Sequence, residues 1–95
     1  MTYKLEFVVS ALKEWEKLDQ GLRQQFKKKL AERLDTPRIE ASLLKGMPDC
    51  YKIKLKSSGY HLVYKVLDEE IVVLVVAVGK RERNAVYKTA IQRTK

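Results

Sequence analysis

The segment Cys50–Tyr60 restricts the fold of this chain more than any other stretch, because apolar and cationic residues alternate in it with a period of two. Alternate side chains of a β-strand point to opposite faces. The apolar residues then share one face, and the other face carries three lysines: Lys52, Lys54 and Lys56. The alternation therefore predicts a strand with a core on one side and a row of cations on the other.

Other segments also have the composition of strands: Thr2–Val8, Tyr60–Leu67 and Ile71–Val78. The short polar stretches Ser57–Gly59 and Asp68–Glu70 predict the turns that join the later strands. Ile71–Val78 is apolar at every position, which predicts a central strand that is covered on both faces and closed by Gly79.

A hairpin with its tip at Ser57 and Ser58 also has a predicted register, with Lys54 opposite His61 and Ile53 opposite Leu62. Its apolar face then gathers Tyr51, Ile53, Leu55, Tyr60, Leu62 and Tyr64. Its other face gathers Lys52, Lys54 and His61. A shift by one residue would set lysines against the buried residues, which a buried face disfavours.

Two helices are predicted before the hairpin. Ser10 can N-cap the first helix, whose inward stripe is Ala11, Leu12, Trp15 and Leu18. After a break at residues 19–21, the second helix has the stripe Leu22, Phe26, Leu30 and Leu34 and ends before Pro37. The cations off this stripe are expected on a solvated face, with phosphate contact as the alternative: Lys27, Lys28, Lys29 and Arg33.

Residues 38–49 read as an irregular connection, and Asn84–Lys95 as a terminal helix. The side chains expected to face inward from that helix are Ala85, Val86, Ala90 and Ile91. The predicted order is β-α-α-β-β-β-α, an α+β fold with a mostly antiparallel sheet. The length predicts a single domain over residues 1–95.

Composition narrows the range of partners. The formal net charge is +8, which favours a polyanion such as RNA or DNA. The longest apolar run has eight residues, against about 20 for a membrane-spanning helix, and no targeting segment is evident. The single cysteine, Cys50, fits a reducing cytosol. One histidine and one cysteine do not provide a zinc site, and no cofactor is indicated.

The C-terminal segment Lys80–Lys95 adds six basic residues and one acidic residue. The lysine strand, the loop after Gly79 and Tyr87 could converge on one groove. One interpretation is a patch that binds phosphate without chemistry. The other is RNA cleavage by transesterification, which needs a base for the 2′-hydroxyl, cations for the phosphate and an acid for the leaving 5′-oxygen.

In the second interpretation, Lys52 or Lys54 is the base, because neighbouring cations favour the neutral form of a lysine. Arg81 can clamp the phosphate through its planar guanidinium, and Tyr87 can stack on a base or donate a proton.

At these residues the chain resembles the RelE family of bacterial toxins. The resemblance covers essentially the whole length, and its motifs are Leu12–Trp15, Thr36–Glu40, Gly46–Leu55, Ser57–Tyr60, Leu62–Tyr64 and Val78–Arg83. It implies a small microbial-RNase-like fold and a ribosome-dependent endoribonuclease. This enzyme would contact 16S rRNA and cut mRNA in the A site of the 70S ribosome. It also implies neutralisation by a RelB-like antitoxin, with operator DNA bound only through the joint complex. The short apolar runs indicate no membrane partner.

The resemblance also implies residue roles. Lys52 and Lys54 match the catalytic lysines, Arg81 the arginine that stabilises the transition state, and Tyr87 the tyrosine that orients the substrate. Lys56, near the hairpin tip, is expected to contact the ribosome, and Arg83 the ribosome or RNA. Solvated surface charge is the alternative for Arg83.

One residue departs from the family. His61 stands where the family usually has a phosphate-binding arginine, and a neutral imidazole does not provide the bidentate contact of a guanidinium. His61 then weakens catalysis, contributes when protonated, or is incidental. The remaining alternatives are a ParE-like toxin or an attenuated toxin, both acting by binding without RNA cleavage.

Overall fold

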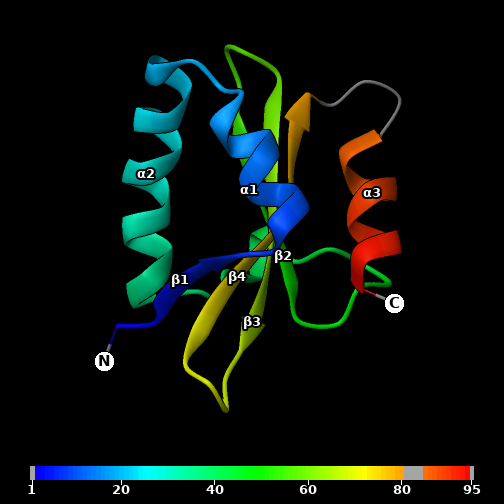
Figure 1. Ribbon diagram of the computed structural model, residues 1–95. Coiled ribbons are helices and arrows are strands. Elements are labelled where there is room, and N and C mark those ends of the chain that lie inside the picture. Colours follow the sequence, from blue (N-terminus) through cyan, green and yellow to red (C-terminus); the bar gives the residue numbers. More distant parts are fainter. Residues whose placement is uncertain (1, 81–84, 95) are drawn as a thin grey trace.

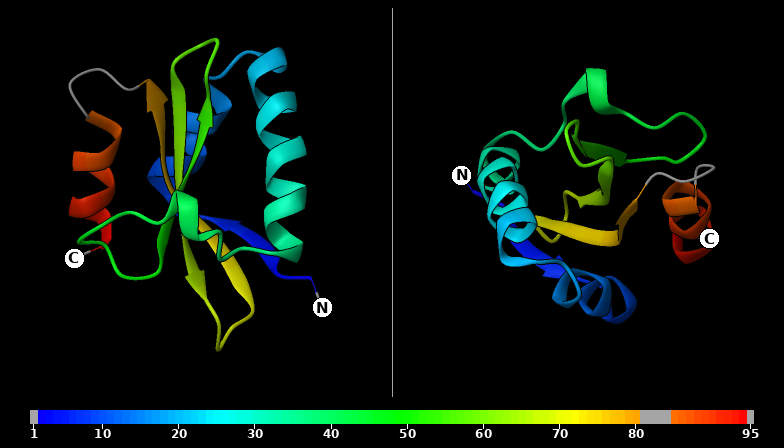
Figure 2. Two further views of the ribbon diagram at one scale, coloured as in Figure 1. Left: turned by 180° about the vertical axis from the view of Figure 1, so that it is seen from behind. Right: turned by 90° about the horizontal axis from the view of Figure 1, so that it is seen from above.

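The computed structural model describes residues 2–80 and 85–94 and shows a four-stranded sheet with helices on both faces (Figures 1 and 2). The elements in chain order are β1 (Lys4–Phe7), α1 (Val9–Glu16), α2 (Gln20–Asp35), a 3₁₀ helix (Glu40–Ser42), β2 (Cys50–Leu55), β3 (Tyr60–Leu67), β4 (Val72–Lys80) and α3 (Ala85–Thr94). The predicted α+β order is confirmed. Within the two described ranges, no helix is long and apolar enough to cross a membrane.

The strand order in the sheet is β1-β4-β3-β2, with β1 parallel to β4 and the other pairs antiparallel. β4 is central and largely buried, as predicted. The prediction that Gly79 closes this strand is wrong, because Gly79 pairs with His61 and Lys80 pairs with Tyr60. The pairing of β3 with β4 therefore extends to Tyr60, the first residue of β3.

The β2–β3 hairpin has the predicted register. Lys54 lies opposite His61, and Ile53 lies opposite Leu62. Gly59 adopts φ 73° in the turn, a conformation that glycine reaches without a steric penalty. The register therefore directs the apolar face of the hairpin toward α1 and α2 and leaves the lysines on the face that packs against α3.

The first face of the sheet packs against α1 and α2 (Figure 2). Trp15 links the layers, with ring centroids 5.3 Å from Phe7 and 6.1 Å from Phe26. Asp19 N-caps α2 by accepting a hydrogen bond of 2.8 Å from the Leu22 amide. Leu12 is 41% exposed and lies outside this core, contrary to the prediction.

The prediction that Ser10 N-caps α1 is also wrong. Val8 occupies the N-cap with an extended backbone and without a side-chain hydrogen bond, and Ser10 lies inside the helix. Val8 is already hydrogen-bonded to Val75 through its amide, so the helix begins directly where β1 leaves the sheet.

The second face packs against α3 and the loop before β2. Its buried residues are Met47, Cys50, Val63, Val76, Ala77, Val86 and Ala90. Val76 and Ala77 both face this side because the β3–β4 register shifts between Val63 and Tyr64. Ala85 and Ile91 are exposed, which corrects the prediction that they face inward. Each lies one position outside the Val86–Ala90 pair and is rotated about 100° away.

Arg33 corrects the prediction of a solvated face for every cation on α2. Its side chain is partly buried and donates hydrogen bonds to the Lys52 carbonyl at 3.3 Å, the Tyr64 hydroxyl at 2.8 Å and Ser42 Oγ at 3.2 Å. β2 lies at the edge of the sheet. Arg33 therefore donates to a backbone carbonyl at the edge of the sheet, and this carbonyl belongs to Lys52, one of the candidate lysines.

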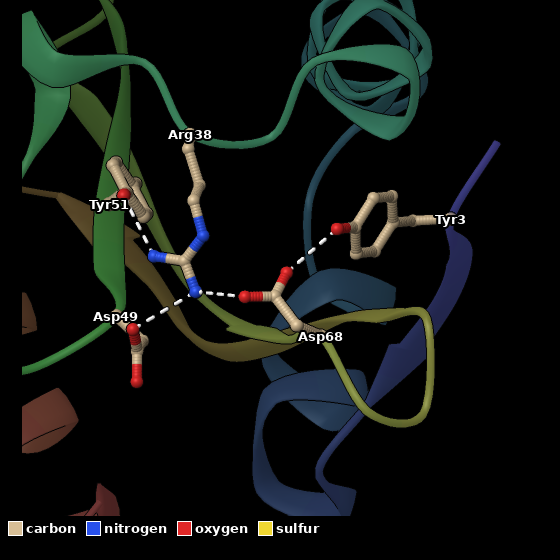
Figure 3. A network of polar contacts seen from close by, with 5 residues as sticks. All are labelled: Tyr3, Arg38, Asp49, Tyr51 and Asp68. Carbon is tan, nitrogen blue, oxygen red and sulfur yellow. Dashed lines mark hydrogen bonds and ion pairs between the residues drawn. The ribbon is translucent and has the colours of Figure 1, made fainter. Parts of the chain in front are cut away.

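Arg38 is the centre of a polar network at the end of the sheet away from the β2–β3 turn (Figure 3). It contacts Asp68 at 2.6 Å, Asp49 at 3.0 Å and the Tyr51 hydroxyl at 3.2 Å. Tyr3 donates a further hydrogen bond of 2.7 Å to Asp68. The network joins β1, the loop after α2, the start of β2 and the β3–β4 turn.

Candidate active site

The structure places the lysines of β2 on the face that α3 covers. Lys52 is partly buried opposite Val63, and Lys54 is exposed opposite His61. Lys56 is exposed just beyond β2, in the turn. The row of lysines thus runs from the edge of the α3 core toward the hairpin tip.

His61 is the buried polar side chain of the described residues, with 6% of its surface exposed. Its Nδ1 atom forms a hydrogen bond with the hydroxyl of Tyr87 on α3. The two rings lie edge to face, with centroids 5.5 Å apart and planes at 79°. The structure thus brings together two predicted site residues that are 26 positions apart in the chain.

α3 is positioned by packing and by one ion pair. Val86 and Ala90, on either side of Tyr87, are buried against the sheet. Arg93 pairs with Glu14 of α1 at 2.8 Å and donates to the Val76 carbonyl at 2.8 Å. Glu14 also accepts a hydrogen bond of 3.1 Å from the Val78 amide. These contacts fix the helix that carries Tyr87.

The hairpin turn, the end of β4 and the start of α3 lie at the same end of the molecule (Figure 1). Arg81 and Arg83 fall outside the described residues. The neighbouring Lys80 is described, and its Nζ atom lies 5.7 Å from the centre of the Tyr60 ring. The chain therefore leaves β4 and enters α3 at the end where Lys54 and His61 lie.

Two other buried titratable groups, one on each face of the sheet, have structural roles. Burial raises the pKa of the Cys50 thiol, which disfavours the nucleophilic thiolate. Burial also raises the pKa of Tyr64, whose hydroxyl donates to the Pro37 carbonyl at 2.6 Å. Among residues 2–80 and 85–94, no cluster of three or more histidine, cysteine or acidic side chains could hold a metal ion.

The site does not coincide with either of two depressions on the surface. These have volumes of about 500 Å³ each and lie along the loop at residues 43–49 and beside the β3–β4 turn. Neither is lined by Lys52, Lys54, His61 or Tyr87. The candidate site is instead a cationic face with an aromatic hydroxyl beside it, which suits an extended phosphate backbone.

Three supporting residues were missed from the sequence: Glu14, Arg33 and Arg93. The contacts of these residues span 9 to 79 positions of the sequence, and most of them join different secondary-structure elements. A charged residue on an amphipathic helix is expected to be solvated. No local pattern distinguishes these residues from the solvated ones.

Comparisons with known proteins identify the family. Residues 5–85 match the model of a family described as the ParE toxin of the type II toxin–antitoxin system parDE. The class is thus that of the type II toxins. The chain is also 62% identical to the mRNA interferase toxin RelE of Escherichia coli K12 over 93 residues, covering 98% of each.

Solved structures give the same result. The free-state structure of the E. coli toxin RelE (R81A/R83A) mutant has a TM-score of 0.93 and 59% identity and covers 100% of both chains. The same mutant in complex with an antitoxin RelBc peptide has a TM-score of 0.83 and 60% identity over 98% of both chains. The chain belongs to the RelE family of type II toxins.

Proposed function

We propose that this protein is an endoribonuclease toxin that cleaves mRNA in the ribosomal A site and thereby inhibits translation. The observation that carries the proposal is that the lysines of β2 and Tyr87 of α3 share one face of the sheet around His61. The 62% identity to an mRNA interferase supports it.

In the proposed reaction, the ribose 2′-hydroxyl attacks the adjacent phosphorus, the 5′-oxygen leaves, and a 2′,3′-cyclic phosphate remains. Lys54 is the general base, since it is the exposed lysine beside His61. Lys52 and Arg81 stabilise the additional negative charge on the phosphate, and Arg81 assists the leaving oxygen. Tyr87 orients or stacks on the substrate.

The remaining charges contact the ribosome. Lys56 in the hairpin turn and Arg83, which follows β4 in the sequence, are the proposed contacts with 16S rRNA and mRNA. Positioning by the ribosome supplies the alignment that a few lysines on an open face do not provide alone. The protein therefore cuts naked RNA far more slowly than mRNA on a ribosome.

A RelB-like antitoxin is the proposed protein partner, supported by solved RelE–RelB complexes of relatives at 60% and 64% identity. The joint complex binds operator DNA and represses its own operon. The site of action is the cytoplasm, where the ribosomes are.

The test is primer-extension mapping of mRNA on ribosomes with a programmed, empty A site. We expect cleavage by the wild-type protein and a loss of about a hundredfold or more in Lys54→Ala, the size of a general-base contribution. Lys54→Ala combined with Arg81→Ala should abolish cleavage. Lys4→Ala is the matched control, because Lys4 is an exposed lysine on the strand at the opposite edge of the sheet.

Unchanged cleavage in the double variant would overturn the assignment of the site. A second candidate is a toxin that acts by binding alone, which the ParE description of the matching family favours. In that case, the wild-type protein leaves mRNA intact on ribosomes while still binding its target.

A further inference from the structure

The hydrogen bond between His61 and Tyr87 can have either group as the donor, and the proposed function does not depend on which one donates. Tyrosine has one hydroxyl hydrogen, and a neutral imidazole has one nitrogen that accepts and one that donates. Tyr87 comes from α3 and His61 from β3, and their hydrogen bond crosses the candidate site. The protonation state of the imidazole therefore affects where the tyrosine hydrogen points.

We propose that His61 is a positioning residue that directs the hydroxyl hydrogen of Tyr87, so that protonation of the imidazole turns that hydrogen toward bound RNA. The inference rests on the proposed function for the identity of the substrate. His61 acts through Tyr87 in this proposal, so its own side chain does not need to touch the phosphate.

The imidazole has two neutral tautomers and one protonated form, and in this proposal the neutral form is the tautomer whose Nδ1 accepts. When Nδ1 of the neutral imidazole accepts, the hydroxyl hydrogen of Tyr87 is used within the protein. When the imidazole is protonated, both ring nitrogens are donors, and Nδ1 donates to the Tyr87 oxygen. The hydroxyl hydrogen must then point elsewhere, and it can donate to a phosphate oxygen of the RNA.

Burial makes His61 suited to act through a neighbour. With 6% of its surface exposed, the side chain has little area for contact with a phosphate. Tyr87 is partly exposed and covers it. Tyr87, which lies over His61, thus provides a direct route from the buried imidazole to bound RNA.

Within residues 2–80 and 85–94, groups from three elements lie beside His61. Lys54 on β2 is its cross-strand partner, and Tyr87 on α3 is its hydrogen-bond partner. The β4 partner is Gly79, which has no charge. Lys80 follows Gly79 but lies against the Tyr60 ring, on the opposite face of the sheet.

The first experiment does not depend on activity, because the chain has one histidine. NMR titration of its imidazole resonances reports His61 without assignment ambiguity. In Tyr87→Phe, we expect the titration midpoint to move by about half a pH unit or more, the equivalent of one modest hydrogen bond. Tyr60→Phe is the matched control and should leave the midpoint in place. An unmoved midpoint in Tyr87→Phe overturns the inference.

The second experiment measures cleavage on programmed ribosomes from about pH 5.5 to about pH 8.5, which brackets the ordinary titration of histidine. The wild-type rate should have a component that falls about tenfold as pH rises, the rate equivalent of one hydrogen bond to a charged group. His61→Asn keeps a polar group near the Nδ1 position but does not titrate, so this component should disappear. It should also disappear in Tyr87→Phe, where adding His61→Asn should have no further effect.

The outcomes separate the two hypotheses. A pH component that persists in Tyr87→Phe means that His61 acts by another route, which overturns the inference and leaves the RNase proposal intact. Absence of cleavage by the wild-type protein at every pH overturns the proposed function and, with it, the role toward RNA. The NMR midpoint then still decides whether His61 and Tyr87 are coupled. If His61→Asn does not fold, Tyr87→Phe and its control Tyr60→Phe are compared with the wild type in both the NMR titration and the pH profile.

Discussion

Ile71 has a left-handed backbone conformation, with φ 56°, which β-branched side chains rarely adopt. It is the last residue of the β3–β4 turn, and its amide bonds to the Asp68 carbonyl at 3.2 Å. Asp49 also has a positive φ of 62°, but a short polar side chain tolerates this region far better. The turn therefore contains an unfavourable residue where asparagine or glycine is preferred.

We expect Ile71→Asn to increase the free energy of unfolding by about 1 kcal/mol, since the left-handed region penalises the isoleucine by about 1–2 kcal/mol and part of its buried side chain is lost. Urea denaturation measures the change. Glu70→Asn, one position earlier in the same turn, is the matched control and should have little effect. A destabilised Ile71→Asn protein would show that packing of the isoleucine outweighs its backbone strain.

Sequence reasoning assigned Ile71 to the strand because isoleucine is typical of strands. The turn needs four residues between Leu67 and Val72, which pair with each other. The composition of Asp68–Glu70 predicts a turn but not its length. The geometry of the connection overrides the propensity of the fourth residue.

At the scale of elements, α3 depends on the pair formed by Arg93 and Glu14. β1 pairs with β4 only as far as Val75, so the later part of β4 has an open edge on that side. Arg93 and Glu14 satisfy two backbone groups there, the Val76 carbonyl and the Val78 amide. One ion pair thus closes the sheet edge and fastens the helix.

We expect Arg93→Met to lower the free energy of unfolding by about 1 kcal/mol, a value discounted because the two side chains are 24% and 32% exposed. Chemical denaturation gives the measurement. Lys88→Met removes an exposed charge from the same helix and should stay within about 0.5 kcal/mol of the wild type. Equal effects of the two variants would mean that the ion pair contributes nothing specific.

The helices show where sequence patterns suffice. The stripe on α2 correctly predicted Phe26 and Leu30 as buried, because large apolar residues recurred every four positions. On α3, small and apolar residues occur on several sides, and the pattern did not select Val86 and Ala90 over Ala85 and Ile91. Only the contact with the sheet makes that choice.

At the scale of the whole molecule, the Arg38 network ties distant segments together and makes stability depend on pH. Two hydrogen bonds, the larger effect from Tyr3 and the smaller from Arg38, hold the pKa of Asp68 below its ordinary value of 3.8. A carboxyl whose pKa is lower in the folded state stabilises that state above the unfolded pKa. The contribution is lost as pH falls through the folded value.

Wild-type protein should therefore be more stable than Asp68→Asn at about pH 7, and the difference should shrink toward zero at about pH 2. Thermal unfolding across this range is the measurement. Glu69→Gln, at the adjacent position in the turn, controls for the loss of one acidic group. A difference that stays constant with pH would show that the network stabilises the fold by packing rather than by charge.

The same scale shows what sequence could not supply about the architecture. The α+β class and the hairpin register were predicted, because alternating apolar and charged residues mark the faces of β2 and β3. The bulge at Val76 was not predicted, because β4 is apolar throughout and an unbroken apolar run does not mark its faces. The parallel pairing of Lys4 with Val72 joins segments too far apart in sequence for a local pattern to identify.

For the site, the sequence identified the lysines and Tyr87 as candidates on one surface. It did not predict that His61 is buried beneath Tyr87 and bound to it. That contact depends on how α3 lies over the sheet, which is set by Val86, Ala90 and Arg93.

The central position of β4 has a consequence for synthesis on the ribosome. β4 is the last strand to be made, yet it lies between β1 and β3 and contributes to both cores. The earlier segments β1, α1 and α2 therefore have no completed surface to pack against until residue 80 has left the exit tunnel. Folding is therefore delayed until nearly all of these elements have emerged from the ribosome.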